Sequence, residues 1–278
     1  MYEAFFGLRE APFALTPDTR YFLGAQTHQQ ALELLLVALA QQEGFVRVSG
    51  EVGTGKTLLC RLLLSALEGR VMTAWLPNPG MGPEGLYAAL ADELGADVGD
   101  VPAHRLLRII HQRLLALAAE GRSVVLIVDE AHTLGVAGLE AVRLLSNLET
   151  ERRKLLQIVL LGQPELEVLL ARDDLRQLQQ RITFSCRLQP LDRQAVADYV
   201  EHRLRQAGYA GVRLFDARAL RALAQASGGI PRLINVLAHK ALWAAYGDGV
   251  PAVSIRHVRR AVRDTDSVRP LRWWRAWA

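Results

Sequence analysis

Eight consecutive residues, Gly50 to Thr57, have the types and spacing of a loop that holds phosphate groups. They read Gly-Glu-Val-Gly-Thr-Gly-Lys-Thr, and they match glycine, four variable residues, glycine, lysine and threonine at every fixed position of that pattern. Glycines let the backbone curl so that successive N–H groups point inward, where they can donate to phosphate oxygens. Lys56 can reach the β- and γ-phosphates, and the Thr57 hydroxyl can bind Mg²⁺.

The elements around this loop are the ones that its chemistry requires. An apolar strand pattern at 45–49 precedes the loop, and an amphipathic helix pattern follows it to Leu67. The positive N-terminal end of that helix favours a bound anion. This context argues against a chance glycine-rich turn, so we predict ATP binding. The residues expected to bind the nucleotide are Gly50, Glu51, Val52, Gly53, Thr54, Gly55, Lys56, Thr57 and Leu58.

An acidic pair follows the most apolar strand pattern of the chain. Residues 124–128 are Val-Val-Leu-Ile-Val, as expected of a central strand buried on both faces, and Asp129-Glu130-Ala131-His132 comes next. Ligands bind α/β sheets at the carboxyl ends of the strands. We therefore expect Asp129 to hold Mg²⁺ through water and Glu130 to polarise the water that attacks the γ-phosphate. By itself the pair also fits a strand that ends in a solvated acidic turn. For His132 we favour a structural or solvent-facing position over a catalytic one.

Strand and helix patterns alternate through the first two thirds of the chain. The expected strands are 45–49, 71–76, 124–128, 156–161 and 182–188. Such alternation predicts an α/β fold of the P-loop type, with a parallel five-stranded sheet between helices. After residue 190 only helical patterns follow, opening at Asp192, Asp216, Pro231 and Ser254. We predict an α/β nucleotide-binding domain at 1–190, a small helical domain at 191–265 and a tail at 266–278.

Composition sets broad limits on this chain of 278 residues. Half of its residues are hydrophobic and 22% are charged, as in an ordinary globular protein. The apolar runs are far shorter than the ~20 residues that cross a bilayer, and Met1 to Ala4 does not begin a signal peptide. The two cysteines, Cys60 and Cys186, have neither metal-ligand nor disulfide spacing. We expect a cytoplasmic protein.

Basic charge is concentrated near the C-terminus. Seven arginines and two aspartates from Ser254 to Ala278 contribute +5 to the net charge of +4, so the remaining residues sum to −1. This disfavours a nucleic-acid surface across the body of the chain. Residues 269–278 contain three tryptophans and three arginines. Such a tail suits a membrane interface, a partner protein or stacking on nucleic-acid bases, and it could also dock on its own domain.

In this order and combination the motifs resemble those of the AAA+ ATPases. The similarity extends from an N-terminal Phe6-Gly7-Leu8 stretch through the phosphate loop and Val-Asp-Glu-Ala-His. It continues through Leu161-Gly162-Gln163-Pro164-Glu165-Leu166 and Gln180-Arg181-Ile182 to Gly229-Ile230-Pro231-Arg232-Leu233-Ile234-Asn235. Within this class the chain resembles the general secretion pathway A type, and most closely the ATPases of mannose-sensitive haemagglutinin (MSHA) pilus biogenesis. The resemblance implies a P-loop fold with a helical lid.

The resemblance also assigns roles to three residues beyond the loop. Gln163 occupies the position of the polar residue that senses the γ-phosphate, although many relatives have Asn, Thr or Ser there. Arg181 matches an arginine finger, which would stabilise charge in a neighbouring subunit's site. A surface arginine or an ion pair is the alternative for Arg181, and Arg172 and Arg176 compete for the finger role. Arg232 resembles the second sensor, which couples the lid to the γ-phosphate.

The N-terminal aromatic residues have two interpretations. They resemble the segment that closes over the adenine in such ATPases, and they could equally seal an edge of the core. The residues are Phe5, Phe6, Phe13, Tyr21 and Phe22.

Taken together, the resemblance implies an enzyme that converts ATP to ADP with Mg²⁺ and acts as a homo-oligomeric ring, for which a hexamer is one option. Its partners would be inner-membrane components of a type IV pilus or a type II secretion apparatus, with peripheral contact to the inner membrane through the tail. Two alternatives stay open. One is a DNA-acting ATPase like the loaders of replication or transposition, although the charge distribution disfavours nucleic acid. The other is a nucleotide-gated scaffold with negligible turnover.

Overall fold

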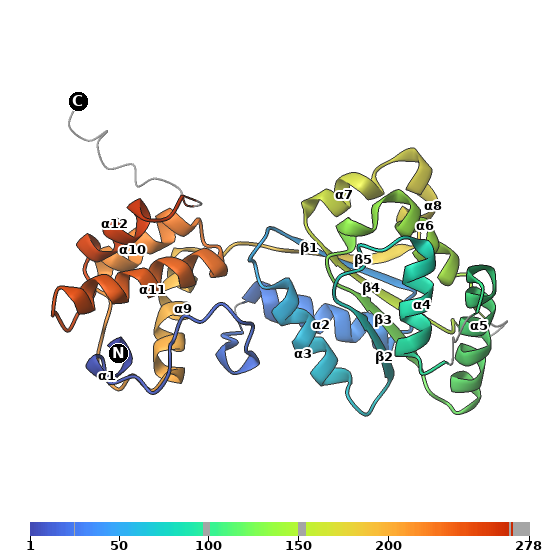
Figure 1. The fold of residues 1–278 in the computed structure, drawn as a ribbon, viewed down its shortest axis with the longest axis horizontal. Coiled ribbons are helices and arrows are strands. Elements are labelled where there is room, and N and C mark those ends of the chain that lie inside the picture. Colours follow the sequence, from blue (N-terminus) through green and yellow to red (C-terminus); the bar gives the residue numbers. More distant parts are fainter. Residues whose placement is uncertain (25, 97–100, 150–153, 267, 269–278) are drawn as a thin grey trace. The chain divides into compact units, whose positions relative to one another are not determined.

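The structure is a computed structural model that describes residues 1–24, 26–96, 101–149, 154–266 and 268. The chain divides into two compact units (Figure 1). The helical unit takes its residues from Met1–Ala25, Gly53–Gly55 and Gln189–Ala278, and the sheet unit from Gln26–Val52 and Lys56–Leu188. Each unit has its own hydrophobic core and is described by itself.

A parallel sheet forms the centre of the sheet unit. Its strands are β1 (Phe45–Gly50), β2 (Met72–Leu76), β3 (Val124–Val128), β4 (Gln157–Gly162) and β5 (Ile182–Leu188). They lie in the order β2-β3-β4-β1-β5, and every pair is parallel. The predicted α/β fold with a five-stranded parallel sheet is confirmed, and each strand begins and ends within one residue of the expected position.

Helices cover both faces of this sheet (Figure 1). They are α2 (Gln26–Ala40), α3 (Lys56–Leu67), α4 (Pro83–Glu93), α5 (Ala103–Ala119), α6 (Gly135–Leu145), α7 (Pro164–Leu170) and α8 (Arg176–Gln179), with 3-10 turns η2 (Ala131–Leu134) and η3 (Asp173–Leu175). Neighbouring residues of β3 divide between the faces. Leu126 and Val128 pack with α4, α5 and α6, whereas Val125 and Ile127 pack with α2 and α3.

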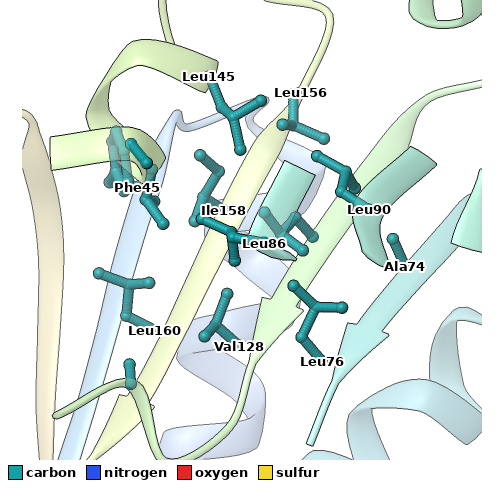
Figure 2. Close-up of a cluster of buried hydrophobic side chains, with 14 of the residues drawn as sticks. Phe45, Ala74, Leu76, Leu86, Leu90, Val128, Leu145, Leu156, Ile158 and Leu160 are labelled. Atoms are coloured by element: carbon teal, nitrogen blue, oxygen red, sulfur yellow. The ribbon is translucent and has the colours of Figure 1, made fainter. Parts of the chain in front are cut away.

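The core on the α4 side is continuous from strand to helix (Figure 2). Leu86 and Leu90 of α4 are fully buried beside Val128, Ile158 and other strand residues of this cluster. A strand that carries apolar side chains on both faces must be covered twice, and this explains the uninterrupted apolar sequence of β3.

In the helical unit, the four helices that the structure describes after residue 190 begin where the sequence predicted them. The helices are α1 (Tyr2–Phe5), α9 (Arg193–Gln206), α10 (Ala217–Ser227), α11 (Pro231–Gly247) and α12 (Ile255–Arg263), with the 3-10 turn η1 (Thr19–Tyr21). The carboxylates of Asp192 and Asp216 accept from the N–H groups of Ala195 (2.8 Å) and Ala219 (2.6 Å), which are helix caps.

The N-terminal segment packs differently from the expectation. The predicted α/β domain at 1–190 includes it, but residues 1–24 pack within the helical unit. Arg203 of α9 donates to the carbonyl oxygen of Pro12 (2.5 Å) and stacks over the Tyr21 ring (4.5 Å to its centroid). Phe13 meets Phe215 edge-on, with the ring centroids 6.0 Å apart. For the buried N-terminal aromatic residues, sealing a hydrophobic core is the role that the structure shows.

Among the helices of the described residues, none has both the length and the apolar character needed to cross a membrane. The expected tail, 266–278, lies outside the described residues except for Asp266 and Val268.

Candidate active site at the carboxyl edge of the sheet

The residues of the candidate site follow three strands that end at one edge of the sheet. The phosphate loop follows β1, Asp129 and Glu130 follow β3, and Gln163 follows β4. Because β4 lies between β3 and β1, the carboxyl ends of these three strands are neighbours. The order of strands therefore brings together residues that are far apart in the sequence.

The phosphate loop has the backbone that its glycines allow. Gly53 and Gly55 adopt φ angles of +80° and +102°, which residues with a side chain rarely adopt. Lys56 begins α3 and is buried, with its ammonium group donating to the carbonyl oxygens of Gly50 (2.8 Å) and Glu51 (3.1 Å). Burial lowers the pKa of Lys56, while the carboxylates of Glu130 and Asp129 act in the opposite direction.

Thr57 and Asp129 meet directly at this edge. The Thr57 hydroxyl donates to Oδ2 of Asp129 (3.0 Å), and the N–H of Glu130 donates to Oδ1 (2.9 Å). Asp129 is only 2% exposed, and burial raises the pKa of its carboxyl group, although these two hydrogen bonds oppose the shift. Two oxygen-bearing side chains thus lie next to each other beside the loop.

Glu130 stands in a different setting from its neighbour. Its backbone is left-handed, with φ +50°, a conformation that costs a non-glycine residue about 1 kcal/mol or more. Its carboxylate accepts from the side-chain amide of Gln163 (3.1 Å) and lies 3.4 Å from Nδ1 of His132. The Glu130 side chain is 34% exposed to solvent. It is therefore held by two partners and still reachable by water.

His132 is closer to the candidate site than we expected from the sequence. It lies in the short turn η2, its side chain is 17% exposed, and its Nδ1 also lies 3.5 Å from the backbone nitrogen of Gln163. These contacts agree with the structural position, one of the two that we favoured over a catalytic one, and not with the solvent-facing position.

The sequence also did not indicate a contact between the strand before the phosphate loop and α7. Ser49, fully buried near the end of β1, donates a short hydrogen bond to the carboxylate of Glu167 in α7. This contact ties the strand that leads into the phosphate loop to the helix that follows Gln163.

Comparison with known proteins agrees with this geometry. Residues 39–170 match the family model described as AAA domain, and this range includes the phosphate loop, Asp129, Glu130 and Gln163. Arg181 and Arg232 lie outside the matched range.

Over its length the chain is similar to general secretion pathway protein A of Aeromonas hydrophila. The two are 41% identical over 277 residues, which are 99% of this chain and 50% of that protein. The chain therefore spans about half the length of the curated relative it matches. The resemblance to the general secretion pathway A type is thus matched by this similarity, whereas the narrower resemblance to the MSHA proteins is not tested by it.

Several solved structures share the fold of this chain. Cdc6p of Pyrobaculum aerophilum gives a TM-score of 0.68 at 18% identity, covering 94% of this chain and 70% of that chain. The ORC1 protein of Aeropyrum pernix, solved in complex with DNA, gives 0.66 at 19% identity, covering 92% and 69%. The RuvB branch migration motor of Thermotoga maritima gives 0.58 at 17% identity, covering 87% and 70%. At these identities the likeness concerns the fold.

The two candidate arginines lie beyond the AAA domain match. Arg181 precedes β5 and donates a short hydrogen bond from its guanidinium group to the Ser146 hydroxyl. Of its competitors, Arg172 pairs with Asp174 (2.9 Å) and Arg176 begins α8. Arg232 lies in the first turn of α11, and its N–H donates to the carbonyl oxygen of Gly53 (3.2 Å), a residue of the same unit.

Proposed function

We propose that this protein is an AAA+ ATPase that binds ATP with Mg²⁺ and hydrolyses it at the carboxyl edge of its sheet. One observation carries the proposal. The same edge presents the Lys56 ammonium group at the phosphate loop, the contact between Thr57 and Asp129, and a glutamate held by Gln163. Phosphoryl transfer requires these three functions, namely a phosphate cradle, a metal site and an oriented water.

The pair of Thr57 and Asp129 fits a magnesium ion. Mg²⁺ prefers oxygen ligands and is commonly bound through one or two protein side chains together with water and phosphate oxygens. Their side-chain oxygens lie 3.0 Å apart, and the carboxyl group is buried at the edge of the loop. Thr57 would hold the ion directly and Asp129 through water. When bound, the ion neutralises charge that develops on the phosphate oxygens.

The remaining roles belong to residues of this chain. The loop from Gly50 to Leu58 binds the phosphates through its backbone N–H groups, and Lys56 adds its positive charge. Glu130 accepts a hydrogen bond from the attacking water and orients it, while Gln163 fixes the carboxylate of Glu130 in place. Arg181 acts on the site of a neighbouring subunit as a finger, and Arg232 acts as the second sensor.

We further propose that hydrolysis supports assembly of a secretion or pilus apparatus at the inner membrane. The similarity to general secretion pathway protein A supports this role. An MSHA-like pilus is the narrower version, and it rests on the sequence motifs alone. The protein would act as an oligomer on the cytoplasmic side of the membrane.

A DNA-acting ATPase is the alternative, since the ORC1 protein of similar fold was solved in complex with DNA. It predicts that duplex DNA stimulates ATP turnover, with a strong decrease as salt rises. Turnover that does not respond to DNA at low salt contradicts it.

The central test is steady-state ATP hydrolysis by the wild type and by Glu130→Gln. The substitution keeps the size and the acceptor oxygen of the side chain but removes its charge. We expect the turnover rate to fall about 10²–10⁴-fold, with the affinity for a fluorescent ATP analogue retained. Lys56→Ala should instead weaken binding of the analogue.

Glu68→Gln is the matched control, because Glu68 is an exposed glutamate at the end of α3. It should leave the rate unchanged. Equal, slow rates in wild type and Glu130→Gln would contradict hydrolysis and favour the nucleotide-gated scaffold.

A further inference from the structure

Arginines gather on one face of the helical unit, which we call the arginine face. They come from the start of α9, from α10 and from α12. They are Arg193, Arg218, Arg221, Arg256, Arg259, Arg260 and Arg263. Two hollows of about 390 and 340 Å³ lie among these side chains, and both hollows include Arg259. The arginine face is therefore one continuous surface.

Helical spacing explains why these side chains point outward together. On α12 the arginines recur at 256, 259, 260 and 263, while Val258 and Ala261 between them are buried in the core of the helical unit. On α10, Arg218 and Arg221 are three residues apart and both exposed. The apolar side of each helix fixes its rotation and leaves the basic side in water.

Acidic residues of the helical unit neutralise little of this charge. Asp248 pairs with Arg260 (3.2 Å) and lies 3.4 Å from Nε2 of His257. Asp192 and Asp216 cap α9 and α10. Among the described residues, no carboxylate lies within ion-pair distance of the other exposed arginines of the face. These are Arg193, Arg218, Arg221, Arg256 and Arg263.

Guanidinium groups without acidic partners are costly to crowd together, because like charges repel. A surface of anionic groups relieves that repulsion, and the planar guanidinium matches phosphate oxygens with two parallel hydrogen bonds. Among the described residues that line the two hollows there is no phenylalanine, tyrosine or tryptophan on which a base could stack. The ligand indicated by this chemistry is a layer of phosphate groups.

We propose that the arginine face docks on the anionic phospholipid headgroups of a membrane. Clusters of four to eight basic residues on helices bind such headgroups. This binding is independent of ATP hydrolysis, so failure of one proposal leaves the other untouched.

The test is co-sedimentation of the full chain with vesicles of equal parts phosphatidylglycerol and phosphatidylcholine. Each arginine near an anionic surface strengthens binding about fivefold. We expect the double variants R218Q/R221Q and R256Q/R263Q each to lower the partition coefficient about tenfold or more. Binding by the wild type should decrease as salt rises and should be absent with vesicles of phosphatidylcholine alone.

R105Q/R108Q is the matched control. Arg105 and Arg108 are also exposed and three residues apart, but they lie on α5 of the sheet unit. This variant removes the same charge and should bind the mixed vesicles like the wild type. Unchanged thermal unfolding and ATP-analogue binding in every variant establish that the chains are folded.

Three results would overturn the proposal. The first is absence of vesicle binding by the wild type. The second is a pair of observations: both arginine-face variants bind the vesicles as strongly as the wild type, and replacing Arg269, Arg272 and Arg275 abolishes binding. That pair would assign membrane binding to the tail. The third is binding to a short DNA duplex that is lost in these variants while the vesicles are not bound, which would assign the face to nucleic acid.

Discussion

At the scale of single residues, two adjacent carboxyl groups at the end of β3 have opposite surroundings. Asp129 is buried and accepts from Thr57 and from a backbone N–H, whereas the Glu130 side chain keeps a third of its exposure. The first arrangement suits a fixed metal ligand. The second suits a group that must meet a water molecule, as the proposed reaction requires.

The burial of Asp129 leads to a prediction about stability. Its pKa is raised in the folded protein, so the folded state binds the proton more tightly than the unfolded state. The ionised group therefore destabilises the fold, and the effect is complete above the folded pKa and lost as the pH falls toward the unfolded value of about 3.9. We expect Asp129→Asn to raise the melting temperature of the nucleotide-free protein near neutral pH. The gain is about 2–4 °C for each kcal/mol relieved.

This gain should shrink as the pH is lowered through the range in which Asp129 takes up its proton. Melting curves from neutral to acidic pH measure it. Asp92→Asn removes an exposed aspartate of α4 and should show no such gain. A melting temperature for Asp129→Asn at or below that of the wild type at neutral pH would contradict the prediction.

The sequence could predict the residues of the loop and the acidic pair, because their chemistry is local and their spacing is fixed. It could not predict the partners of Glu130. The contacts of Glu130 with Gln163 and His132 depend on β3 and β4 being neighbours in the sheet and on the turn η2. Those are properties of the folded chain, as is the hydrogen bond between Arg181 and Ser146.

At the scale of secondary-structure elements, the strands were predictable because each is a short apolar run between helical patterns. The position of the N-terminal segment was not. Aromatic residues such as Phe6 and Phe13 signal burial but not the surface that buries them, and here they pack in the helical unit. The polar partner Arg203, which is 6% exposed and holds this segment through Pro12, carries no signal in the sequence.

The connection between α10 and α11 depends on one glycine. Gly229 adopts φ +78°, and a Cβ placed there would lie 2.0 Å from the carbonyl oxygen of Leu191. Its own carbonyl oxygen accepts from the N–H of Leu191 (2.9 Å), so the two backbones cannot separate without losing this bond. We expect Gly229→Ala to reduce the free energy of unfolding by about 3 kcal/mol or more, measured by urea denaturation.

Gly249→Ala distinguishes the close approach from the φ angle alone. Gly249 has a similar φ of +66°, but nothing lies within 4 Å of the added Cβ. This variant should lose only about 1 kcal/mol. Equal losses at the two positions would mean that the contact with Leu191 is unimportant.

At the scale of the whole molecule, the proposed arginine finger would make ATP hydrolysis depend on contact between subunits. If Arg181 completes the site of a neighbouring subunit, Arg181→Ala and Lys56→Ala subunits are each inactive alone. Mixed assemblies contain some interfaces in which an intact phosphate loop faces an intact arginine. We expect mixing the two variants to restore part of the ATP turnover, measured against total subunit concentration.

Arg172→Ala is the control for this experiment, since Arg172 is an exposed arginine paired with Asp174. It should be active alone and need no complementation. Mixtures of Arg181→Ala and Lys56→Ala that show no more activity than the separate variants would remove Arg181 from the finger role.

β1 lies inside the sheet with a strand on each side, and this has a consequence for synthesis of the protein. β1 (Phe45–Gly50) pairs with β4 (Gln157–Gly162) on one side and β5 (Ile182–Leu188) on the other. During synthesis at about 5–20 residues per second, β1 is made roughly 5–20 seconds before β4 is complete. Both edges of this apolar strand lack their native partners in that interval, whereas β2 and β3 can pair sooner. The nascent chain therefore has an apolar strand with two unpaired edges just before its phosphate loop while residues 51–156 are being translated, and such edges can pair with other chains.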